Sequence, residues 1–201
     1  MYAITPDHTY PNLRLASQVV QAIQGGAKIV QYRNKNCNCS PQDKQATVEA
    51  VLKVCQAYQV PLLINDDVEL ALTIQAAGVH LGQTDMDPTL ARQHLGPQVI
   101  IGVSCYNSLD LAIAAQAVGA NYVAFGRFFA STTKPLAVSA QPKLLKQARS
   151  KLHIPIVAIG GITPMNGKNL ITQGADMLAV VGALFAVGDI KTNAKAFANL
   201  F

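Results

Sequence analysis

Short apolar runs alternate with longer amphipathic segments along the chain, and this alternation restricts the fold more than any other feature of the sequence. The runs have strand length, and the segments between them have helical spacing. Strands are predicted at residues 2–4, 29–30, 62–64, 79–81, 99–103, 122–125, 156–159 and 177–181. Helices are predicted at residues 13–23, 40–58, 68–76, 88–95, 109–117, 142–152 and 166–173, with a helical remainder. Strands that are apolar on both faces are typical of a parallel sheet covered by helices.

A glycine followed by alanine recurs where a predicted helix ends and a strand begins. The pairs are Gly26-Ala27, Gly119-Ala120 and Gly174-Ala175. Glycine tolerates the left-handed backbone that commonly ends a helix, and its recurrence marks a repeated αβ unit. Eight such units in 201 residues predict an α/β fold, a (β/α)8 TIM barrel that forms a single domain over residues 1–201. A doubly wound open sheet is the alternative.

Composition narrows the class of protein. Half of the residues are hydrophobic and 13% are charged, which is typical of a globular chain. The net charge is +5, but the basic residues are scattered and aromatic residues make up only 6%, so a solvated surface is favoured over nucleic-acid binding. A positive net charge also suits phosphorylated small molecules as partners. The longest apolar run, 177–187, is too short to cross a bilayer, and no secretory signal is evident. We expect a cytoplasmic protein with no membrane partner, and homo-oligomerisation stays open.

Carboxylates and amides follow two of the predicted strands at the point where each strand ends. Asn65 and Asp66 follow the third strand, and Asp85 follows the fourth. Because parallel strands joined by a helix end at the same edge of a sheet, Asp66 and Asp85 are expected to converge. Converging carboxylate oxygens suit a hard cation, so a Mg²⁺ site is expected here. These aspartates, or their neighbours Asp67 and Asp87, could instead cap the following helices, a role that does not exclude metal binding.

Two basic residues, Arg33 and Lys35, follow the second predicted strand. Arginine offers a planar set of donors and lysine a mobile point charge, a combination that suits a diphosphate. Ordinary salt bridges are the alternative. The nearby Asn65, Asp66 and Asp85 favour the diphosphate, because a metal-bridged diphosphate needs both cations and carboxylates.

Glycines follow the last two predicted strands. Gly160-Gly161 comes after the seventh strand and Gly182 after the eighth. In a barrel this is the usual place for a phosphate held by backbone N–H groups, although glycine also ends strands for steric reasons.

Other candidates are weaker. His80 lies at the end of the fourth strand, where a hydrogen-bonded structural histidine is favoured over a catalytic one. Cys37 and Cys39 lack a second pair of ligands at zinc spacing, so metal binding there is not expected. Cys105 has no evident histidine partner that would make it a nucleophile.

Several motifs stand in order at barrel spacing and are more specific together than any one alone. They are Tyr2-Ala3-Ile4-Thr5, Gln31-Tyr32-Arg33-Asn34-Lys35, Ile64-Asn65-Asp66, Gly78-Val79-His80-Leu81-Gly82-Gln83-Thr84-Asp85, Ile101-Gly102-Val103-Ser104, Tyr122-Val123-Ala124-Phe125-Gly126, Ser131-Thr132-Thr133-Lys134 and Ala158-Ile159-Gly160-Gly161-Ile162. With these motifs the chain closely resembles the thiamine-phosphate synthase family over almost its whole length. The resemblance implies a (β/α)8 fold and the coupling of 4-amino-2-methyl-5-(diphosphooxymethyl)pyrimidine with carboxylated thiazole phosphate. The products would be thiamine monophosphate, pyrophosphate and carbon dioxide.

The resemblance also implies roles for individual residues. The pyrimidine diphosphate would be bound by Gln31, Tyr32, Arg33, Asn34, Lys35, Asn65, Ser104 and Lys134. The thiazole phosphate would be bound by Ser131, Thr132, Thr133, Gly161, Val181 and Gly182, and Mg²⁺ by Asp66 and Asp85. The catalytic residues would be Arg33, Lys35, Lys134 and Ser104. The three cations would stabilise the pyrophosphate as it leaves in a dissociative step, and thiazole nitrogen would then capture the cationic methylene.

The chain departs from the family pattern at three places. The family commonly has Gly-Pro where Gly126-Arg127 stands, threonine in place of Ser131 and serine in place of Gly182.

Two rival interpretations follow from the same fold. Thiazole tautomerases share the thiazole phosphate site but handle no diphosphate, and the retained diphosphate-binding residues argue against them. A non-catalytic barrel that senses thiazole or thiamine phosphates is the second rival, and no DNA-reading element supports it.

Overall fold

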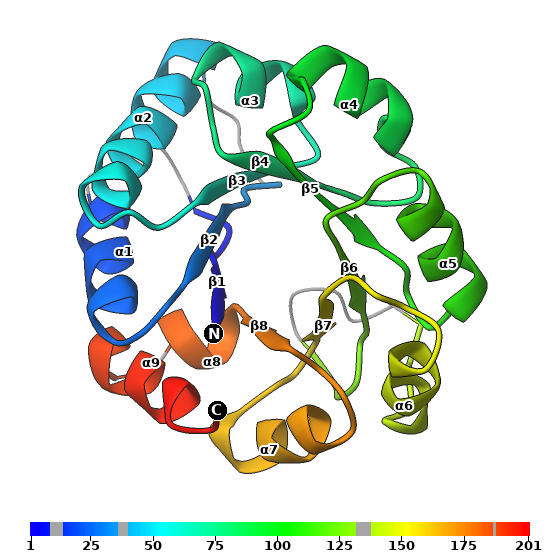
Figure 1. Cartoon of the computed structure of the whole chain (residues 1–201). Helices are drawn as coiled ribbons and strands as arrows, with labels where there is room; N and C mark the ends of the chain where they lie inside the picture. Colours follow the sequence, from blue (N-terminus) through cyan, green and yellow to red (C-terminus); the bar gives the residue numbers. More distant parts are fainter. Residues whose placement is uncertain (9–13, 36–39, 132–137, 187) are drawn as a thin grey trace.

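The fold is a closed barrel of eight parallel strands in the order β1-β2-β3-β4-β5-β6-β7-β8 (Figure 1). The computed structural model describes residues 1–8, 14–35, 40–131, 138–186 and 188–201. The strands are β1 (Tyr2–Ile4), β2 (Ile29–Tyr32), β3 (Leu62–Asn65), β4 (Gly78–Leu81), β5 (Ile100–Ser104), β6 (Tyr122–Phe125), β7 (Ile156–Ile159) and β8 (Met177–Val180). The barrel closes because β1 pairs with β8, Tyr2 lying opposite Ala179. The barrel prediction is therefore confirmed, and the open-sheet alternative is wrong.

Helices surround the barrel on its outside (Figure 1). They are α1 (Leu15–Gln24), α2 (Pro41–Ala57), α3 (Val68–Thr73), α4 (Pro88–Leu95), α5 (Leu109–Ala117), α6 (Lys143–Arg149), α7 (Pro164–Thr172), α8 (Gly182–Phe185) and α9 (Ile190–Ala198). The last two form the helical remainder expected after the eighth strand. Among the described residues, no helix is both long enough and apolar enough to cross a membrane.

Local sequence signals account for where the helices begin and end. The Ser40 hydroxyl accepts a hydrogen bond from the Asp43 N–H at 3.1 Å, and proline follows at the first helical position of α2. After α1 and α7 the chain turns through Gly26 and Gly174, which have φ of +109° and +116°. These are conformations that glycine adopts without strain, so the recurring glycines do stop the helices as predicted.

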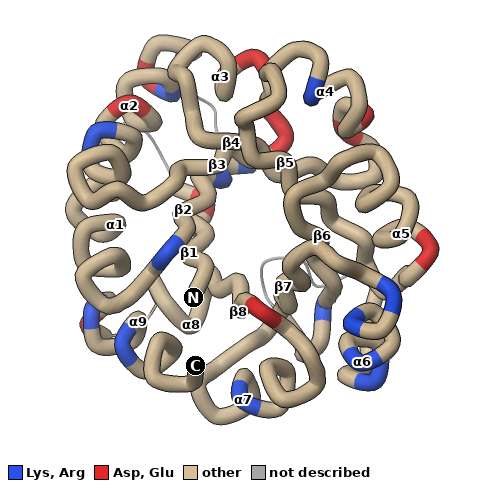
Figure 2. Tube along the Cα trace, viewed as in Figure 1, with Lys and Arg blue, Asp and Glu red and all other residues tan. Residues whose placement is uncertain are grey.

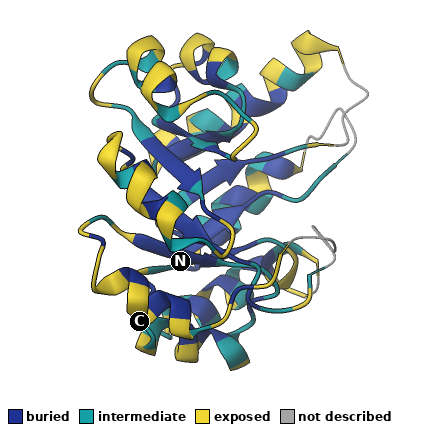
Figure 3. Ribbon diagram, turned by 90° about the vertical axis from the view of Figure 1, so that its right-hand side faces the viewer, coloured by how far each residue is buried: buried dark blue, intermediate teal, exposed yellow. Residues whose placement is uncertain are grey.

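Alternate strand residues supply two hydrophobic layers. One set of side chains packs outward against the helices in a large buried cluster, and the other set fills the inside of the barrel. The inner cluster consists of Tyr2, Ile4, Leu63, Tyr122, Ala124, Val157 and Ala179. The strands are buried almost throughout, whereas the exposed residues lie on the outer helices and on the loops (Figure 3). The strand sequences are therefore continuous apolar runs because both faces of each strand are buried.

Charged residues are spread around the outside of the barrel, with a basic group on α6 (Figure 2). A scattered distribution of this kind is what a solvated surface shows, as the sequence indicated. Other charged residues lie near the carboxyl ends of β2, β3 and β4, and because all eight strands are parallel these ends meet at one rim.

Candidate active site

A cavity of about 580 Å³ lies at the carboxyl ends of the strands. Its lining includes Gln31, Arg33, Lys35, Asn65, Asp66, Asp85, Ser104, Ser131, Gly161, Val181 and Gly182, all of which were predicted as site residues. Tyr32 and Asn34 instead line a neighbouring hollow of about 180 Å³. Thr132, Thr133 and Lys134, like Cys37 and Cys39, lie outside the described residues. Most of the predicted site therefore converges on one cavity.

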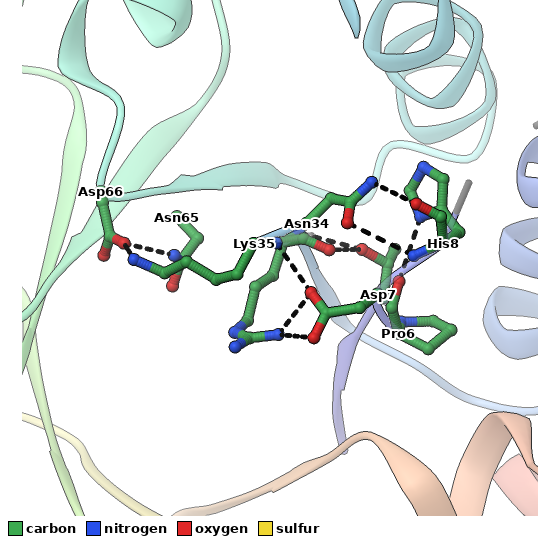
Figure 4. A network of polar contacts seen from close by, with 9 residues as sticks. Pro6, Asp7, His8, Asn34, Lys35, Asn65 and Asp66 are labelled. Atoms are coloured by element: carbon green, nitrogen blue, oxygen red, sulfur yellow. Dashed lines mark hydrogen bonds and ion pairs between the residues drawn. The ribbon is translucent and has the colours of Figure 1, made fainter. Parts of the chain in front are cut away.

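Asp7 holds Arg33 at the rim. The two Asp7 carboxylate oxygens accept hydrogen bonds from Arg33 Nη1 at 2.8 and 2.9 Å, and one of them also accepts from the Lys35 backbone N–H at 2.7 Å (Figure 4). Burial favours a higher pKa for Asp7, but these hydrogen bonds outweigh it and keep the pKa below its ordinary value. The Arg33 side chain is only 9% exposed. Sequence reasoning missed Asp7, because an aspartate shortly after the first strand has no spacing that links it to Arg33.

Asn34 is directed away from the cavity. Its side-chain amide donates to the His8 carbonyl at 2.9 Å and accepts from the His8 N–H at 3.3 Å (Figure 4). These two bonds tie the segment after β1 to the end of β2 and keep Asp7 beside Arg33.

Lys35 forms an ion pair with Asp66 across the ends of β2 and β3 (Figure 4). Asn65 Nδ2 donates to the same Asp66 oxygen at 2.7 Å. Asp66 has a left-handed backbone, with φ of +64°, and its N–H donates to the His80 carbonyl at 2.9 Å. The basic pair, Arg33 and Lys35, thus meets carboxylates that follow neighbouring strands, and of these the sequence predicted Asp66 but not Asp7.

The carboxylate pair, Asp66 and Asp85, converges at the same rim. Burial raises the pKa of Asp85, and the adjacent Asp66 carboxyl raises it further through hydrogen bonding and charge. The Gly82 N–H, which donates to Asp85 at 2.7 Å, and the Lys35 charge act in the opposite direction. Two carboxyl groups this close cannot both ionise without cost, and a divalent cation removes that cost.

The helix caps are provided by other aspartates. Asp67 accepts a hydrogen bond from the Leu70 N–H at 2.9 Å, and Asp87 accepts one from the Thr89 N–H at 2.8 Å. The alternative of capping by Asp66 and Asp85 is therefore wrong. No group of three or more His, Cys, Asp and Glu side chains gathers as a metal site in the described part of the chain. A cation between the carboxylate pair would take its remaining ligands from water and phosphate, as Mg²⁺ commonly does.

Two consecutive glycines form the opposite side of the cavity. Gly160 and Gly161 have φ of +102° and +64°, and the chain from Arg127 to Ala130 packs against them. A Cβ on Gly160 would lie 2.3 Å from Arg127 Cβ, and one on Gly161 would lie 2.3 Å from the Ala130 oxygen. Side chains cannot be accommodated there, so bare backbone lines the cavity at these positions.

Three further residues complete this side of the cavity. Ser131, Val181 and Gly182 line it, and Gly182 is the first residue of α8. A Cβ on Gly182 would meet no atom within 4 Å. Arg127 also lines the cavity; its peptide bond with Gly126 is cis, and its N–H donates to the Val138 carbonyl at 3.0 Å.

Ser104 and His80 lie on the neighbouring strands β5 and β4. The Ser104 carbonyl accepts a hydrogen bond from Gln83 Nε2 at 2.7 Å, which joins the loop after β4 to the end of β5. His80 Nδ1 lies 2.9 Å from the hydroxyl of the buried Tyr122. The interpretation of His80 as a hydrogen-bonded structural residue is supported by this contact.

A parallel eight-stranded barrel with a charged cavity at its carboxyl rim is the architecture of the (β/α)8-barrel enzymes. The sequence profile of the family described as "Thiamine monophosphate synthase" matches residues 1–184. The chain belongs to this family, and it is a transferase that forms a C–N bond.

Individual relatives agree with this assignment. The thiamine-phosphate synthases of Nitrosococcus oceani and Methylobacillus flagellatus are each 49% identical over 201 residues, covering all of this chain and 92% and 94% of those proteins. Among solved structures, "Thiamine phosphate pyrophosphorylase from Pyrococcus furiosus" superposes with a TM-score of 0.86 at 28% identity, covering 99% of this chain and 93% of that one. The similarity extends over the barrel as a whole.

Proposed function

We propose that the protein couples 4-amino-2-methyl-5-(diphosphooxymethyl)pyrimidine with carboxylated thiazole phosphate to give thiamine monophosphate, pyrophosphate and carbon dioxide. The observation that carries this proposal is the meeting of the basic pair and the carboxylate pair in one cavity, opposite the Gly160-Gly161 backbone. Cations and carboxylates together suit a metal-bound diphosphate, and exposed backbone suits a phosphate monoester. The names of the relatives support the same reaction.

The basic pair binds and stabilises the diphosphate. In the described part of the chain Asp7 engages only Nη1 of Arg33, which leaves the other guanidinium donors for phosphate oxygens. Lys35 reaches the same space from its contact with Asp66. Lys134, outside the described residues, is proposed to add a third cation. Charge that develops on the departing pyrophosphate is then met by groups already in place.

The carboxylate pair is proposed to hold Mg²⁺. The bound ion would supply further neutralisation of the diphosphate oxygens. Asn65 fixes the orientation of Asp66 through its hydrogen bond, and Gly82 fixes that of Asp85. Both carboxylates are thus oriented before any ligand enters.

The reaction then needs little proton transfer from the protein. The bond between the methylene carbon and the diphosphate oxygen breaks, and its electron pair leaves with pyrophosphate. Thiazole nitrogen donates the electron pair of the new C–N bond. The thiazole carboxylate is lost as carbon dioxide, and the electron pair of the broken C–C bond stays on the ring carbon, which takes a proton from water. Gln31 and Ser104 are proposed to bind the pyrimidine. Ser131, Gly161, Val181 and Gly182 are proposed to hold the thiazole phosphate, together with Thr132 and Thr133, which lie outside the described residues. Tyr32 and Asn34 line the neighbouring hollow and are proposed to support the strand end that carries Arg33 and Lys35. The protein acts mainly by positioning and by electrostatic stabilisation.

The test mixes both heterocycles with Mg²⁺ and follows thiamine monophosphate and pyrophosphate over time. Equimolar formation of the two products supports the proposal. Isomerisation of the thiazole phosphate without consumption of the pyrimidine would instead assign the protein to the tautomerases. Tight binding of thiamine monophosphate without turnover would assign it a sensing role. Cytoplasmic location and the oligomeric state stay predictions that this assay does not address.

A further inference from the structure

A chain of hydrogen bonds crosses the inside of the barrel beneath the cavity. Gln31 Nε2 donates to the Tyr2 hydroxyl at 2.6 Å, the Tyr2 and Tyr122 hydroxyls lie 2.8 Å apart, and the Tyr122 hydroxyl lies 2.9 Å from His80 Nδ1. Gln31, Tyr2 and Tyr122 are each at most 2% exposed. These four residues come from β2, β1, β6 and β4, so the chain connects strands on different sides of the barrel. No role assigned above uses the two tyrosines.

Packing fixes the rings of this chain. The Tyr2 and Tyr122 rings meet edge to face at 5.9 Å, and the His80 ring stacks on Tyr122 at 5.7 Å. Gly102 provides the space for Tyr122, because a Cβ at that position would lie 1.9 Å from the Tyr122 Cζ atom. The oxygen atoms of the two hydroxyl groups are therefore held in place.

The donor that Gln31 places against Tyr2 sets the direction of the hydrogen bonds. Burial raises the pKa of Tyr2 and of Tyr122 above the ordinary value, so both hydroxyls keep their protons. Each hydroxyl has one proton to donate, and Tyr2 already accepts from Gln31. Tyr2 therefore donates to Tyr122, and Tyr122 donates to His80 Nδ1. Every donor in the chain then has an acceptor, with the imidazole proton on Nε2.

The same contact determines which atom Gln31 presents to a ligand. Since its NH₂ group is bound to Tyr2, the other end of the amide is the carbonyl oxygen Oε1. Gln31 lines the cavity, and among the described residues Oε1 has no hydrogen-bond partner and is not a fully enclosed atom. An acceptor thus faces the cavity at this point.

We propose that Tyr2 and Tyr122 are positioning residues that lock the Gln31 amide with Oε1 toward the cavity, so that the site selects a heterocycle carrying an exocyclic amine over its carbonyl counterpart. This inference rests on the proposed function, in which an aminopyrimidine binds here. An amide and its flipped form have nearly the same shape, so packing alone does not choose between them; a fixed hydrogen bond does. A carbonyl placed against Oε1 would bring two acceptors together and leave both without a donor.

The experiment uses two unphosphorylated probes, 4-amino-5-hydroxymethyl-2-methylpyrimidine and the analogue with a 4-oxo group. Binding of each to the full chain is measured by calorimetry, and the ratio of the two Kd values is compared between variants. Wild type is expected to prefer the amine by at least about tenfold, the discrimination that one buried hydrogen-bond mismatch gives. Tyr2→Phe frees the amide to turn, and the ratio is expected to fall to within about threefold, a loss on the order of one such bond.

Tyr122→Phe tests the direction of the chain separately. Without an acceptor in Tyr122, the Tyr2 proton turns to Gln31 Oε1, the amide flips, and the preference is expected to vanish or to favour the oxo probe.

Tyr58→Phe is the matched control, because it removes an exposed tyrosine hydroxyl that accepts from Gln24 at 3.1 Å, outside the cavity lining. The ratio in this variant should equal that of wild type. Both probes are titrated into the same preparation, so a partly unfolded fraction cancels from the ratio.

The possible outcomes separate the two proposals. An unchanged ratio in both Tyr2→Phe and Tyr122→Phe would overturn the positioning role while leaving the coupling reaction intact. A wild type that forms thiamine monophosphate but binds both probes equally would do the same. Failure of wild type to bind either probe, together with no turnover, would overturn the proposed function and this inference with it.

Discussion

Asp66 and Asp67 are neighbours in the sequence, yet their carboxylates serve different purposes. Asp67 caps α3, while the left-handed backbone of Asp66 places its carboxylate at the cavity beside Lys35 and Asp85. The same division separates Asp85 from Asp87, which caps α4. A difference of one or two residues in position thus decides whether an aspartate caps a helix or lines the cavity. Substitutions at these positions should divide in the same way.

The carboxylate pair should bind Mg²⁺ in the absence of substrate. At a Mg²⁺ concentration ten times its Kd, binding stabilises the fold by about 1.4 kcal/mol, which raises Tm by about 3–6 °C in a domain of this size. Asp85→Asn should abolish this rise, and at limiting Mg²⁺ it should lower kcat at least about tenfold. Asp87→Asn is the matched control, because asparagine also caps helices well. Thermal melts with and without Mg²⁺ give the answer; equal Mg²⁺ shifts in the two variants would contradict the metal assignment.

The contact between Asp7 and Arg33 should depend on pH. Asp7→Asn removes the charge that pairs with Arg33, and the free energy of unfolding at pH 7 should fall by about 1.5–3 kcal/mol. Because the pKa of Asp7 is lowered in the folded state, its stabilisation is complete above the unfolded value of 3.8 and is lost as the pH falls through the lower folded value. Urea unfolding of wild type and Asp7→Asn should therefore converge in strong acid. Asp110→Asn, at an exposed position on α5, should unfold like wild type at every pH. If Asp7→Asn still differed from wild type in strong acid, the ion pair could not be the cause of the difference.

At the scale of the elements, the sequence carried most of the information about the barrel. Predicted strands agree with the observed ones to within a residue or two, because runs such as 156–159 are apolar on both faces. Helix ends were harder to predict: the predicted third helix extends to residue 76, whereas α3 ends at Thr73. Ile74 and Ala76 are apolar, but Gln75 has a left-handed backbone with φ of +54°, and the chain there already turns toward β4. Periodicity does not detect such a turn.

Contacts between strands distant in sequence could not be predicted. The sequence placed Arg33, Lys35, Asp66 and Asp85 at one rim because strand ends coincide in any parallel barrel. Asp7 and the pair of tyrosines escaped notice, since their partners depend on the register of β1 with β2 and on contacts across the barrel. The sequence shows which residues follow the strand ends. Contacts that depend on strand register or that cross the barrel are not visible in it.

The short helix α8 offers a test of the phosphate side. Gly182 begins this helix and has open space around it, so Gly182→Ser should leave Tm unchanged. The added hydroxyl would supply a further donor to the thiazole phosphate. The KM of the thiazole phosphate should therefore fall by about fivefold, as expected for one hydrogen bond. Gly182→Ala fills the same space without a donor and should keep the KM of the parent. Steady-state kinetics with each substrate varied in turn provide the measurement, and an equal effect on the KM of the pyrimidine would argue against this placement of the phosphate.

At the scale of the whole molecule, the two ends of the chain close the ring of helices. Helix α9 packs against α1 so tightly that a Cβ on Gly25 would lie 2.3 Å from Ala194 Cβ. Phe197 of α9 is fully buried, whereas Phe201 at the end of the chain is 56% exposed. The last helix therefore completes the shell that covers β1 and β8, the strands that close the barrel.

Closure of the ring should contribute strongly to global stability. Phe197→Ala removes a buried ring, and the free energy of unfolding should fall by about 3–5 kcal/mol. Phe201→Ala makes the same chemical change four residues later, where the ring is exposed, and should alter stability by less than about 0.5 kcal/mol. Denaturant unfolding monitored by circular dichroism compares the two. Similar losses in both variants would show that α9 does not act through its buried face.

The side chains of Tyr2, Leu63, Tyr122 and Val157 fill the barrel axis beneath the cavity. Under the proposed function, both substrates would therefore enter and leave over the carboxyl rim, because these side chains fill the axis. Gln31 is only 2% exposed, so the heterocycle that contacts it would have to enter before its partner. We therefore expect compulsory-order steady-state kinetics, with inhibition at high concentrations of the thiazole phosphate when it binds first.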